Sequence, residues 1–338
     1  MDMEEIVALS VKRNVSDLHL CSAWPPRWRR QGLLEDAPFP PPDIEAILRE
    51  ALTDEQQGEW WANRQVDFAL ELADQQRLRA SAFMHHRGIS LALRLLPNDC
   101  PKLYALDAPP ALEQLLACDS GLVLVTGATG SGKSTTLAAM VDYLNHRLAG
   151  HILTLEDPVE FVHRGAQCLI EQREIGQHCP SFADGLRAAL REDPDVILIG
   201  ELRDGETIRL ALTAAETGHL VLATLHTRGA AQAVERLIDT FPAEEKAWVR
   251  SQLAGSLQAV LAQKLEADKQ GGRVALFELL VNTPAVANLI RDGKTHQLPG
   301  LMQTGQQAGM QTFRQSRQQR IAAGRLAEQG GDQACCSK

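Results

Sequence analysis

The first hundred residues show the alternation of apolar and polar positions that is typical of a sheet with one face in solvent. Leu78, Ala80 and Ala82 alternate with arginine and serine side chains, which is the period of two expected of such a strand. Residues 89–96 repeat the pattern. Further short strands are expected at 16–20, 29–37 and 66–72, and two polar helical stretches at 42–63. The pattern predicts a small α+β domain.

Farther along the chain the pattern changes to apolar runs separated by helical segments. The runs lie at 121–127, 151–157, 195–202 and 219–227, and helices begin near Gly132, Phe182, Asp204 and Gly229. Strands this apolar are usually buried on both faces, and their alternation with helices predicts a parallel sheet in an α/β domain. A long amphipathic helix is expected from Pro242 to about Leu265. A strand at 273–281 and polar helices follow.

A segment rich in proline separates the two patterns. Pro101, Pro109 and Pro110 interrupt both periods within residues 98–110, as a linker does. We therefore expect an N-terminal domain at 1–98, a linker at 99–112, an α/β domain at 113–330 and a loose tail at 331–338.

Composition and charge narrow the classes of function. The 338 residues carry a formal net charge of −9, which argues against nucleic-acid binding through broad electrostatic attraction and against direct binding to lipid. No apolar run approaches the roughly 20 residues needed to span a bilayer, and the N-terminus is acidic, so we expect a cytoplasmic protein. Seven scattered cysteines without a CxxC pair suggest neither a disulfide framework nor a zinc site.

The stretch GATGSGKS, residues 127–134, satisfies the phosphate-binding pattern GxxxxGK[ST]. It follows an apolar strand and opens a helix, which is the context that the motif requires. Its backbone N–H groups would surround phosphate oxygens of ATP, Lys133 would reach the β- and γ-phosphates, and the Ser134 hydroxyl would ligate Mg²⁺. A plain glycine turn is the alternative. The candidate nucleotide-binding residues are Gly127, Ala128, Thr129, Gly130, Ser131, Gly132, Lys133, Ser134 and Thr135.

Acidic residues follow two of the predicted strands. In DVILIGELRD, Glu201 ends a buried strand, where a P-loop enzyme places the carboxylate that holds Mg²⁺ or orients the attacking water. In LEDPVEF, Glu156, Asp157 and Glu160 lie just beyond another strand, and a carboxylate there could take a proton from that water. A solvated strand end and an Asp-Pro turn are the respective alternatives. His219 and His226 flank the fourth strand, where either could sense the γ-phosphate or bond a backbone carbonyl.

In order and context, these motifs resemble the Walker A, Asp box, Walker B and His box of the secretion and type IV pilus ATPase superfamily. The chain most resembles its twitching-motility retraction (PilT-type) group. The similarity extends from SDLHL and PPRWRRQG near the N-terminus, through the central block at 190–227, to SLQAVLAQKL, ANLIRDGKTHQLP and MQTGQQAGMQTF. The resemblance implies a PAS-like N-terminal domain, a RecA-like ATPase domain with a parallel-type central sheet, and a homohexameric ring.

The resemblance also assigns roles by position. Glu160 would be the general base, Glu201 the Walker B carboxylate that shares Mg²⁺ with Ser134, and His219 and His226 the His box. Arg79 and Arg94 match N-terminal-domain arginines that reach the phosphates in this family, although a surface ion pair is the alternative for each. The implied partner is an inner-membrane pilus platform protein, contacted peripherally and without insertion into the membrane.

Two departures from the retraction group concern motor output. Where that group has the first arginine of A-I-R-N-L-I-R-E, this chain has Ala287, and Arg228-Gly229-Ala230 replaces small polar residues. The sequence therefore leaves open a divergent paralogue with altered output, an assembly or secretion ATPase, a nucleotide-binding regulator without hydrolysis, and a nucleic-acid motor.

Overall fold

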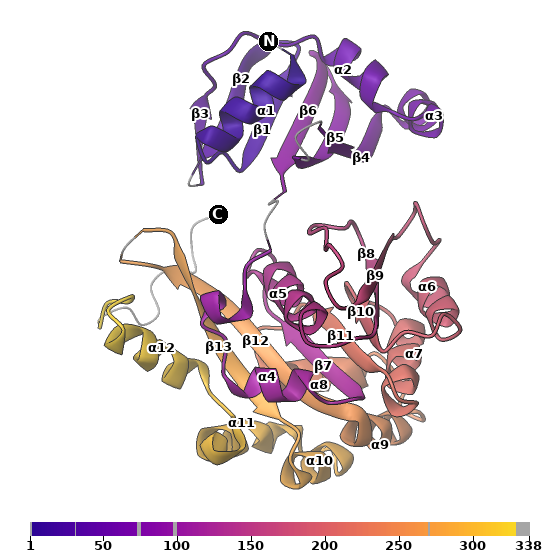
Figure 1. Ribbon diagram of the computed structural model, residues 1–338, viewed down its shortest axis with the longest axis vertical. Helices are drawn as coiled ribbons and strands as arrows, with labels where there is room; N and C mark the ends of the chain where they lie inside the picture. The colour runs from indigo at the N-terminus through magenta and orange to yellow at the C-terminus, as the bar shows by residue number, and fades with distance from the viewer. Residues whose placement is uncertain (1, 31, 73–75, 97–99, 270, 329–338) are drawn as a thin grey trace. The chain divides into compact units, whose positions relative to one another are not determined.

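The computed structural model describes residues 2–30, 32–72, 76–96, 100–269 and 271–328 (Figure 1). The expected tail at 331–338 and the first linker residue lie outside these ranges. The chain divides into two compact units, residues 1–99 and 100–338.

The first unit is an antiparallel sheet packed against helices. Its six strands have the order β3-β2-β1-β6-β5-β4. The strands are β1 (Asp17–Cys21), β2 (Trp24–Arg30), β3 (Leu33–Asp36), β4 (Gln65–Glu71), β5 (Arg77–His85) and β6 (Gly88–Leu95). The helices are α1 (Met3–Lys12), α2 (Ile44–Ala51) and α3 (Asp54–Asn63). The predicted alternation is confirmed, because Leu78, Ala80 and Ala82 are fully buried.

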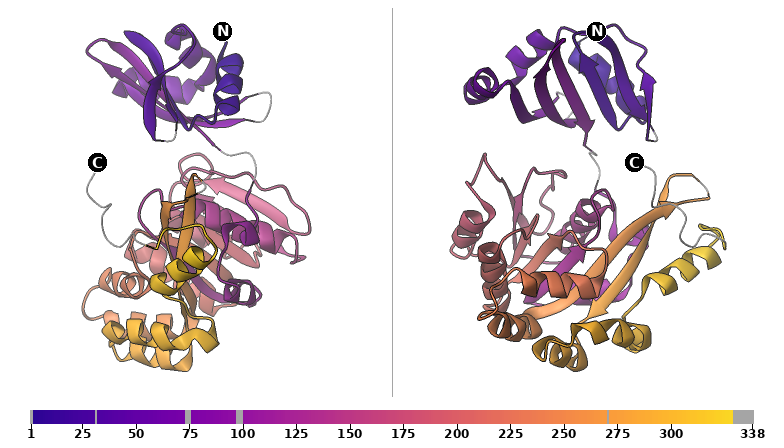
Figure 2. Two further views of the ribbon diagram at one scale, coloured as in Figure 1. Left: turned by 90° about the vertical axis from the view of Figure 1, so that its left-hand side faces the viewer. Right: turned by 180° about the vertical axis from the view of Figure 1, so that it is seen from behind.

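The second unit is built on a mostly parallel sheet, which Figure 2 shows from two further directions. Its strand order is β13-β12-β7-β11-β10-β8-β9, with the strands labelled in Figure 1. Only the edge pair β12–β13 is antiparallel. The strands are β7 (Gly121–Thr126), β8 (His151–Glu156), β9 (Leu169–Glu174), β10 (Val196–Ile199), β11 (Leu220–Leu225), β12 (Leu257–Ala267) and β13 (Arg273–Val281). The α/β fold class is therefore confirmed.

Helices cover both faces of this sheet. Leu122 and Leu124 of β7 pack into one apolar cluster, whereas Val123 and Val125 pack into the other. Burial on both faces explains why the strands lack a polar face. The helices of this unit are α4 (Ala111–Leu116), α5 (Lys133–Asn145), α6 (Phe182–Ala189), α7 (Gly205–Glu216), α8 (Ala230–Asp239), α9 (Lys246–Ser256), α10 (Pro284–Arg291), α11 (Leu298–Thr304) and α12 (Phe313–Ala322), with 3₁₀ turns η1 (Leu103–Leu106), η2 (Thr295–Gln297) and η3 (Gly305–Ala308).

The prediction of one long helix from Pro242 to about Leu265 is wrong for the second half of that range. Helix α9 ends at Ser256, and residues 257–267 form β12, which pairs with β7 and β13. Residues 259–262 are fully buried, so the apolar run has no wet face from which a period could be read. Pairing with strands distant in the sequence, rather than local helix propensity, determines that this segment is a strand.

Helix α1 and strand β9 are among the elements that have no counterpart in the sequence prediction. Helix α1 begins with a capping box between Asp2 and Glu5, which is a recognised start signal. Strand β9 has the polar sequence LIEQRE and lies at the edge of the sheet. Edge strands are less buried than central ones, so their apolar signal is weak.

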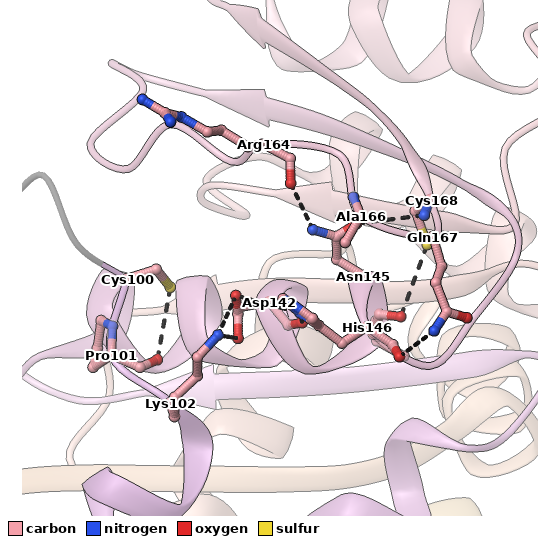
Figure 3. A network of polar contacts seen from close by, with 11 residues as sticks. Cys100, Pro101, Lys102, Asp142, Asn145, His146, Arg164, Ala166, Gln167 and Cys168 are labelled. Atoms are coloured by element: carbon pink, nitrogen blue, oxygen red, sulfur yellow. Dashed lines mark hydrogen bonds and ion pairs between the residues drawn. The ribbon is translucent and has the colours of Figure 1, made fainter. Parts of the chain in front are cut away.

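The segment expected to be a linker is packed against the second unit from Cys100 onward. Leu103 in η1 is buried in the apolar cluster beneath α5. Lys102 donates to both carboxylate oxygens of Asp142 on α5, at 3.0 and 2.8 Å (Figure 3). In the part of the chain that the structure describes, no helix combines the length and apolarity that a bilayer crossing requires.

Candidate functional site

Four of the predicted motifs meet at one edge of the parallel sheet. The phosphate-binding loop follows β7, the segment with Glu160 follows β8, Glu201 follows β10, and His226 follows β11. Because these strands are parallel neighbours, their carboxyl ends lie side by side. This is where open α/β sheets bind ligands.

The loop after β7 has the backbone of an anion-binding turn. Gly127, Gly130 and Gly132 all have positive φ, at 158°, 76° and 89°. A Cβ at Gly132 would lie 2.8 Å from the Gln263 amide nitrogen, so the position is restricted by a neighbour as well as by its own conformation. Gln263 is buried in β12 and accepts a 2.6 Å hydrogen bond from Thr136 on α5. Strand β12 thus packs next to the loop through the side chain of Gln263.

The ammonium group of Lys133 is held inside this loop. It donates to the carbonyl oxygens of Gly127 at 2.9 Å and Ala128 at 3.1 Å. Burial lowers the pKa of Lys133, while the nearby carboxylates of Glu201 and Glu160 act in the opposite direction. A partly desolvated cation lies at the point where phosphate charge would be bound.

His226 connects Lys133 to Glu201. Its Nδ1 lies 3.4 Å from Lys133 Nζ, and its Nε2 lies 3.1 Å from Glu201 Oε1. An ammonium group can only donate and a carboxylate can only accept. These contacts therefore fit a neutral imidazole that accepts at Nδ1 and donates from Nε2. These contacts form a continuous series of polar interactions from Lys133 in the phosphate loop to Glu201 after β10.

Glu201 is fixed by its backbone neighbours as well as by His226. The N–H of Gly200 donates to Leu155 O on β8 at 2.7 Å, and the N–H of Leu202 donates to Thr224 O on β11 at 3.0 Å. The Glu201 side chain is 21% exposed and also accepts from Arg203 Nε at 2.7 Å. It can exchange these partners for a ligand without opening the core.

Glu160 stands between two buried residues, Val159 and Phe161. Its backbone N–H donates to the carboxylate of Glu156. Burial raises the pKa of Glu156, and hydrogen bonds from Thr154 and Gln172 partly offset this rise. The Glu160 carboxylate raises the pKa of Lys133 electrostatically, so it lies near the same site.

The geometry fits a nucleoside triphosphate bound with Mg²⁺. The Ser131 hydroxyl is buried inside the loop and has no hydrogen-bond partner among the described residues, and a phosphate oxygen would satisfy it. Among the described residues there is no cluster of three or more metal-ligating side chains. Mg²⁺ is commonly held by one or two protein groups together with substrate phosphates, and Ser134 and Glu201 are the residues that would supply them.

The structure does not bring His219 to this edge. His219 precedes β11, its ring nitrogen lies 3.0 Å from Ala214 O, and its carbonyl accepts from the N–H of Gly121 at the start of β7. The whole of β11 separates His219 from His226, so His219 lies at the amino-terminal ends of the strands and His226 at their carboxyl ends. The backbone-carbonyl alternative describes its contacts, and His219 is left out of the site.

Arg79 and Arg94 belong to the first unit. They are register partners on β5 and β6 and share the exposed face of that sheet. Arg94 forms a 2.8 Å ion pair with Asp17, which stands opposite it on β1, and its side chain remains 66% exposed. Both arginines are exposed on the surface of their own unit.

Several supporting residues were not found from the sequence. Thr126, at the end of β7, donates to Thr227 O at 2.8 Å and accepts from the N–H of Thr227 at 3.0 Å, which fixes the backbone next to His226. Arg203 and Gln263 also contact the site. Their only sequence signal is proximity to the motifs or, for Gln263, a polar residue within an apolar run.

Comparison with known proteins agrees with this arrangement. Residues 61–330 match the Type II/IV secretion system protein family. The chain is 72% identical to protein YggR of Escherichia coli (strain K12), over 96% of this chain and 100% of that one. It is 48% identical to the type IV pilus retraction ATPase PilT of Pseudomonas aeruginosa, over 93% of this chain and 92% of that one. A crystal structure of the pilus retraction motor PilT with bound ADP superposes with a TM-score of 0.90, at 40% identity, over 97% of this chain and 95% of that one.

The conformation of Gly132 gives a direct test of the phosphate loop. Gly132→Ala should weaken ATP binding about tenfold or more, because a side chain at φ 89° costs about 1–3 kcal/mol and collides with Gln263. Titration of a fluorescent ATP analogue measures the affinity. Gly58→Ala, in an open position of α3, is the control and should bind as the wild type does. Equal affinities of the two variants would contradict this account of the loop.

Proposed function

Because the chain belongs to the Type II/IV secretion system protein family, we propose that it is a motor that uses ATP hydrolysis to do mechanical work on a type IV pilus-like machine. The chain is a P-loop ATPase of the pilus retraction type. The observation that carries the proposal is the continuous series of polar contacts from Lys133 through His226 to Glu201. The electrostatic effect of Glu160 on the same lysine adds to it.

The chemistry follows from the residues at this edge. Water attacks the γ-phosphorus, the bond to the bridging oxygen of the leaving ADP breaks, and Glu160 accepts the proton of the water. Lys133 and the N–H groups of the loop stabilise charge on the phosphate oxygens. Ser134 and Glu201 would hold Mg²⁺, which would neutralise further charge on the phosphate oxygens. Hydrolysis needs an activated water as well as bound phosphate, so the presence of both Glu160 and Glu201 argues against a regulator that only binds nucleotide.

We propose further that six copies form a ring and that one subunit supplies Arg79 and Arg94 to the nucleotide of another. Guanidinium groups stabilise charge on a transferring phosphoryl group. The exposed, adjacent positions of these arginines on β5 and β6 support that role. A subunit that binds ATP and ADP with different affinities in open and closed states would convert each hydrolysis into movement.

The ring would act in the cytoplasm, peripheral to the inner membrane, through a pilus platform protein. Ala287, in place of the family arginine, is half-buried in α10. This position is remote in sequence from the hydrolytic motifs, so we propose that the substitution changes the coupling of hydrolysis to retraction rather than hydrolysis itself.

Glu201→Gln tests whether hydrolysis is the output. The variant keeps the shape of the side chain but lacks its charge, so it should bind ATP and fail to support pilus movement. A deletion strain complemented with the wild type or with Glu201→Gln, and scored by imaging of pilus retraction, provides the measurement. Equal restoration by both would show that hydrolysis does not drive the function.

Subunit mixing tests the arginines. Arg94→Ala should remain a hexamer but lose most hydrolysis, and mixing it with inactive Glu201→Gln subunits should restore part of the activity, because some interfaces then combine an intact Arg94 with an intact Glu201. Phosphate release from the mixture is the measurement. Arg27→Ala, which removes an exposed ion pair between Arg27 on β2 and Asp36 on β3, is the matched control. An Arg94→Ala hexamer with normal hydrolysis would contradict the assignment.

A further inference from the structure

The loop that carries Glu160 is unusual for a parallel sheet. Strands β8 and β9 are adjacent and parallel, a pairing that most often requires a helical crossover. Here residues 157–168 make the connection without a helix. Their backbone N–H and C=O groups must find partners outside regular structure, and side chains provide many of them.

Gln172 on β9 holds the part of the loop around Glu160. Its amide nitrogen donates to Phe161 O at 2.8 Å and to Glu156 Oε1 at 3.0 Å, and its amide oxygen accepts from the N–H of His163 at 2.8 Å. The N–H of His163 can only donate and the other two groups only accept, so the orientation of the amide is determined by its partners. One side chain fixes the backbone on the C-terminal side of Glu160.

The same amide acts on the other side of Glu160 through Glu156. The carboxylate of Glu156 accepts from Gln172, from Thr154 Oγ1 at 2.7 Å and from the backbone N–H of Glu160. Thr154 and Gln172 are register partners on β8 and β9, so the strand pairing itself brings both donors to Glu156. The backbone of Glu160 is therefore fixed directly by Glu156 and indirectly by Gln172.

Other side chains hold the remainder of the loop. Glu174 Oε2 accepts from the N–H of Val159 at 3.1 Å. Asn145, at the end of α5, donates to Arg164 O and accepts from the N–H of Ala166, both at 2.8 Å (Figure 3). With both ends secured independently of Gln172, loss of the Gln172 amide should release the segment around Glu160 and leave the rest of the loop in place.

We propose that Gln172 is a positioning residue for ATP hydrolysis, which sets the location of the Glu160 carboxylate relative to the bound phosphates. The inference rests on the proposed role of Glu160 as the general base. Among the described residues, the hydrogen-bond partners of the Gln172 side chain are Phe161, Glu156 and His163 and not the phosphate loop, Lys133 or Glu201, so its effect on nucleotide binding should be small.

The test is a double-mutant cycle on the full-length protein, measured by single-turnover phosphate release. Gln172→Leu should lower kcat about 10- to 100-fold, as misplacement of a catalytic group by about 1 Å does. Its KM for ATP and its melting temperature should stay near those of the wild type. Glu160→Gln should be slower by about 10²- to 10⁴-fold. The double variant should be no slower than Glu160→Gln alone, because Gln172 would act only through the base.

Gln167→Leu is the matched control. Gln167 belongs to the same loop but donates to His146 O at 2.8 Å, away from Glu160 (Figure 3), so this variant should keep wild-type kcat. If Gln172→Leu does not fold, Gln172→Glu replaces it in the cycle. That variant keeps an acceptor for the N–H of His163 but cannot donate to Phe161 O.

Two outcomes would overturn the inference while the proposed function stands. In one, Glu160→Gln is slow but the Gln172 variant has normal kcat. In the other, the Gln172 substitution slows the Glu160→Gln protein by the same factor as it slows the wild type, which indicates a purely structural role. If Glu160→Gln hydrolyses ATP normally, the assignment of the base fails, and the inference fails with it.

Discussion

The parallel pairing of β7, β8, β10 and β11 is the constraint on which the site depends. It places four strand ends at one edge, so that residues separated by a hundred positions in the chain become neighbours. The pairing is stabilised by apolar side chains on both faces, and the polar groups of the candidate site follow the strand ends. A rigid buried sheet thus carries loops that can be rearranged by a ligand without loss of the core.

The loops at this edge are fixed by side chains from other elements. Gln263 of β12 lies beneath the phosphate loop, Thr126 of β7 holds the backbone beside His226, and Gln172 of β9 holds the segment around Glu160. Thr126 and Gln172 supply hydrogen bonds to irregular backbone, and Gln263 is itself held by a hydrogen bond from Thr136. This preorganisation matters for hydrolysis, because charge on the phosphoryl group is stabilised best by donors already in place.

The phosphate loop could be predicted from the sequence because its signal is local. Glycines, lysine and serine at fixed spacing, between a strand and a helix, describe one continuous turn. The two histidines that flank β11 show that the local sequence does not predict which residues share a site. They flank the same strand, yet a strand of six residues separates its ends by roughly 20 Å, so His226 contacts Lys133 while His219 bonds Ala214 O.

Longer-range features could not be read in the same way. Residues 257–267 are apolar enough for a buried helix or a buried strand, and only their pairing with β7 and β13 decides between them. Gln172 is one polar residue in a polar edge strand, and nothing in the sequence connects it to Phe161 O or His163 N. Its three contacts depend on the register of β9 against β8.

The central claim is that this edge of the sheet cleaves a bound triphosphate. Phosphate release by the purified, assembled wild-type protein, supplied with ATP and Mg²⁺, tests it most directly. The account predicts release of inorganic phosphate that stops when the metal is chelated. Protein that binds ATP under these conditions but releases no phosphate would contradict the account.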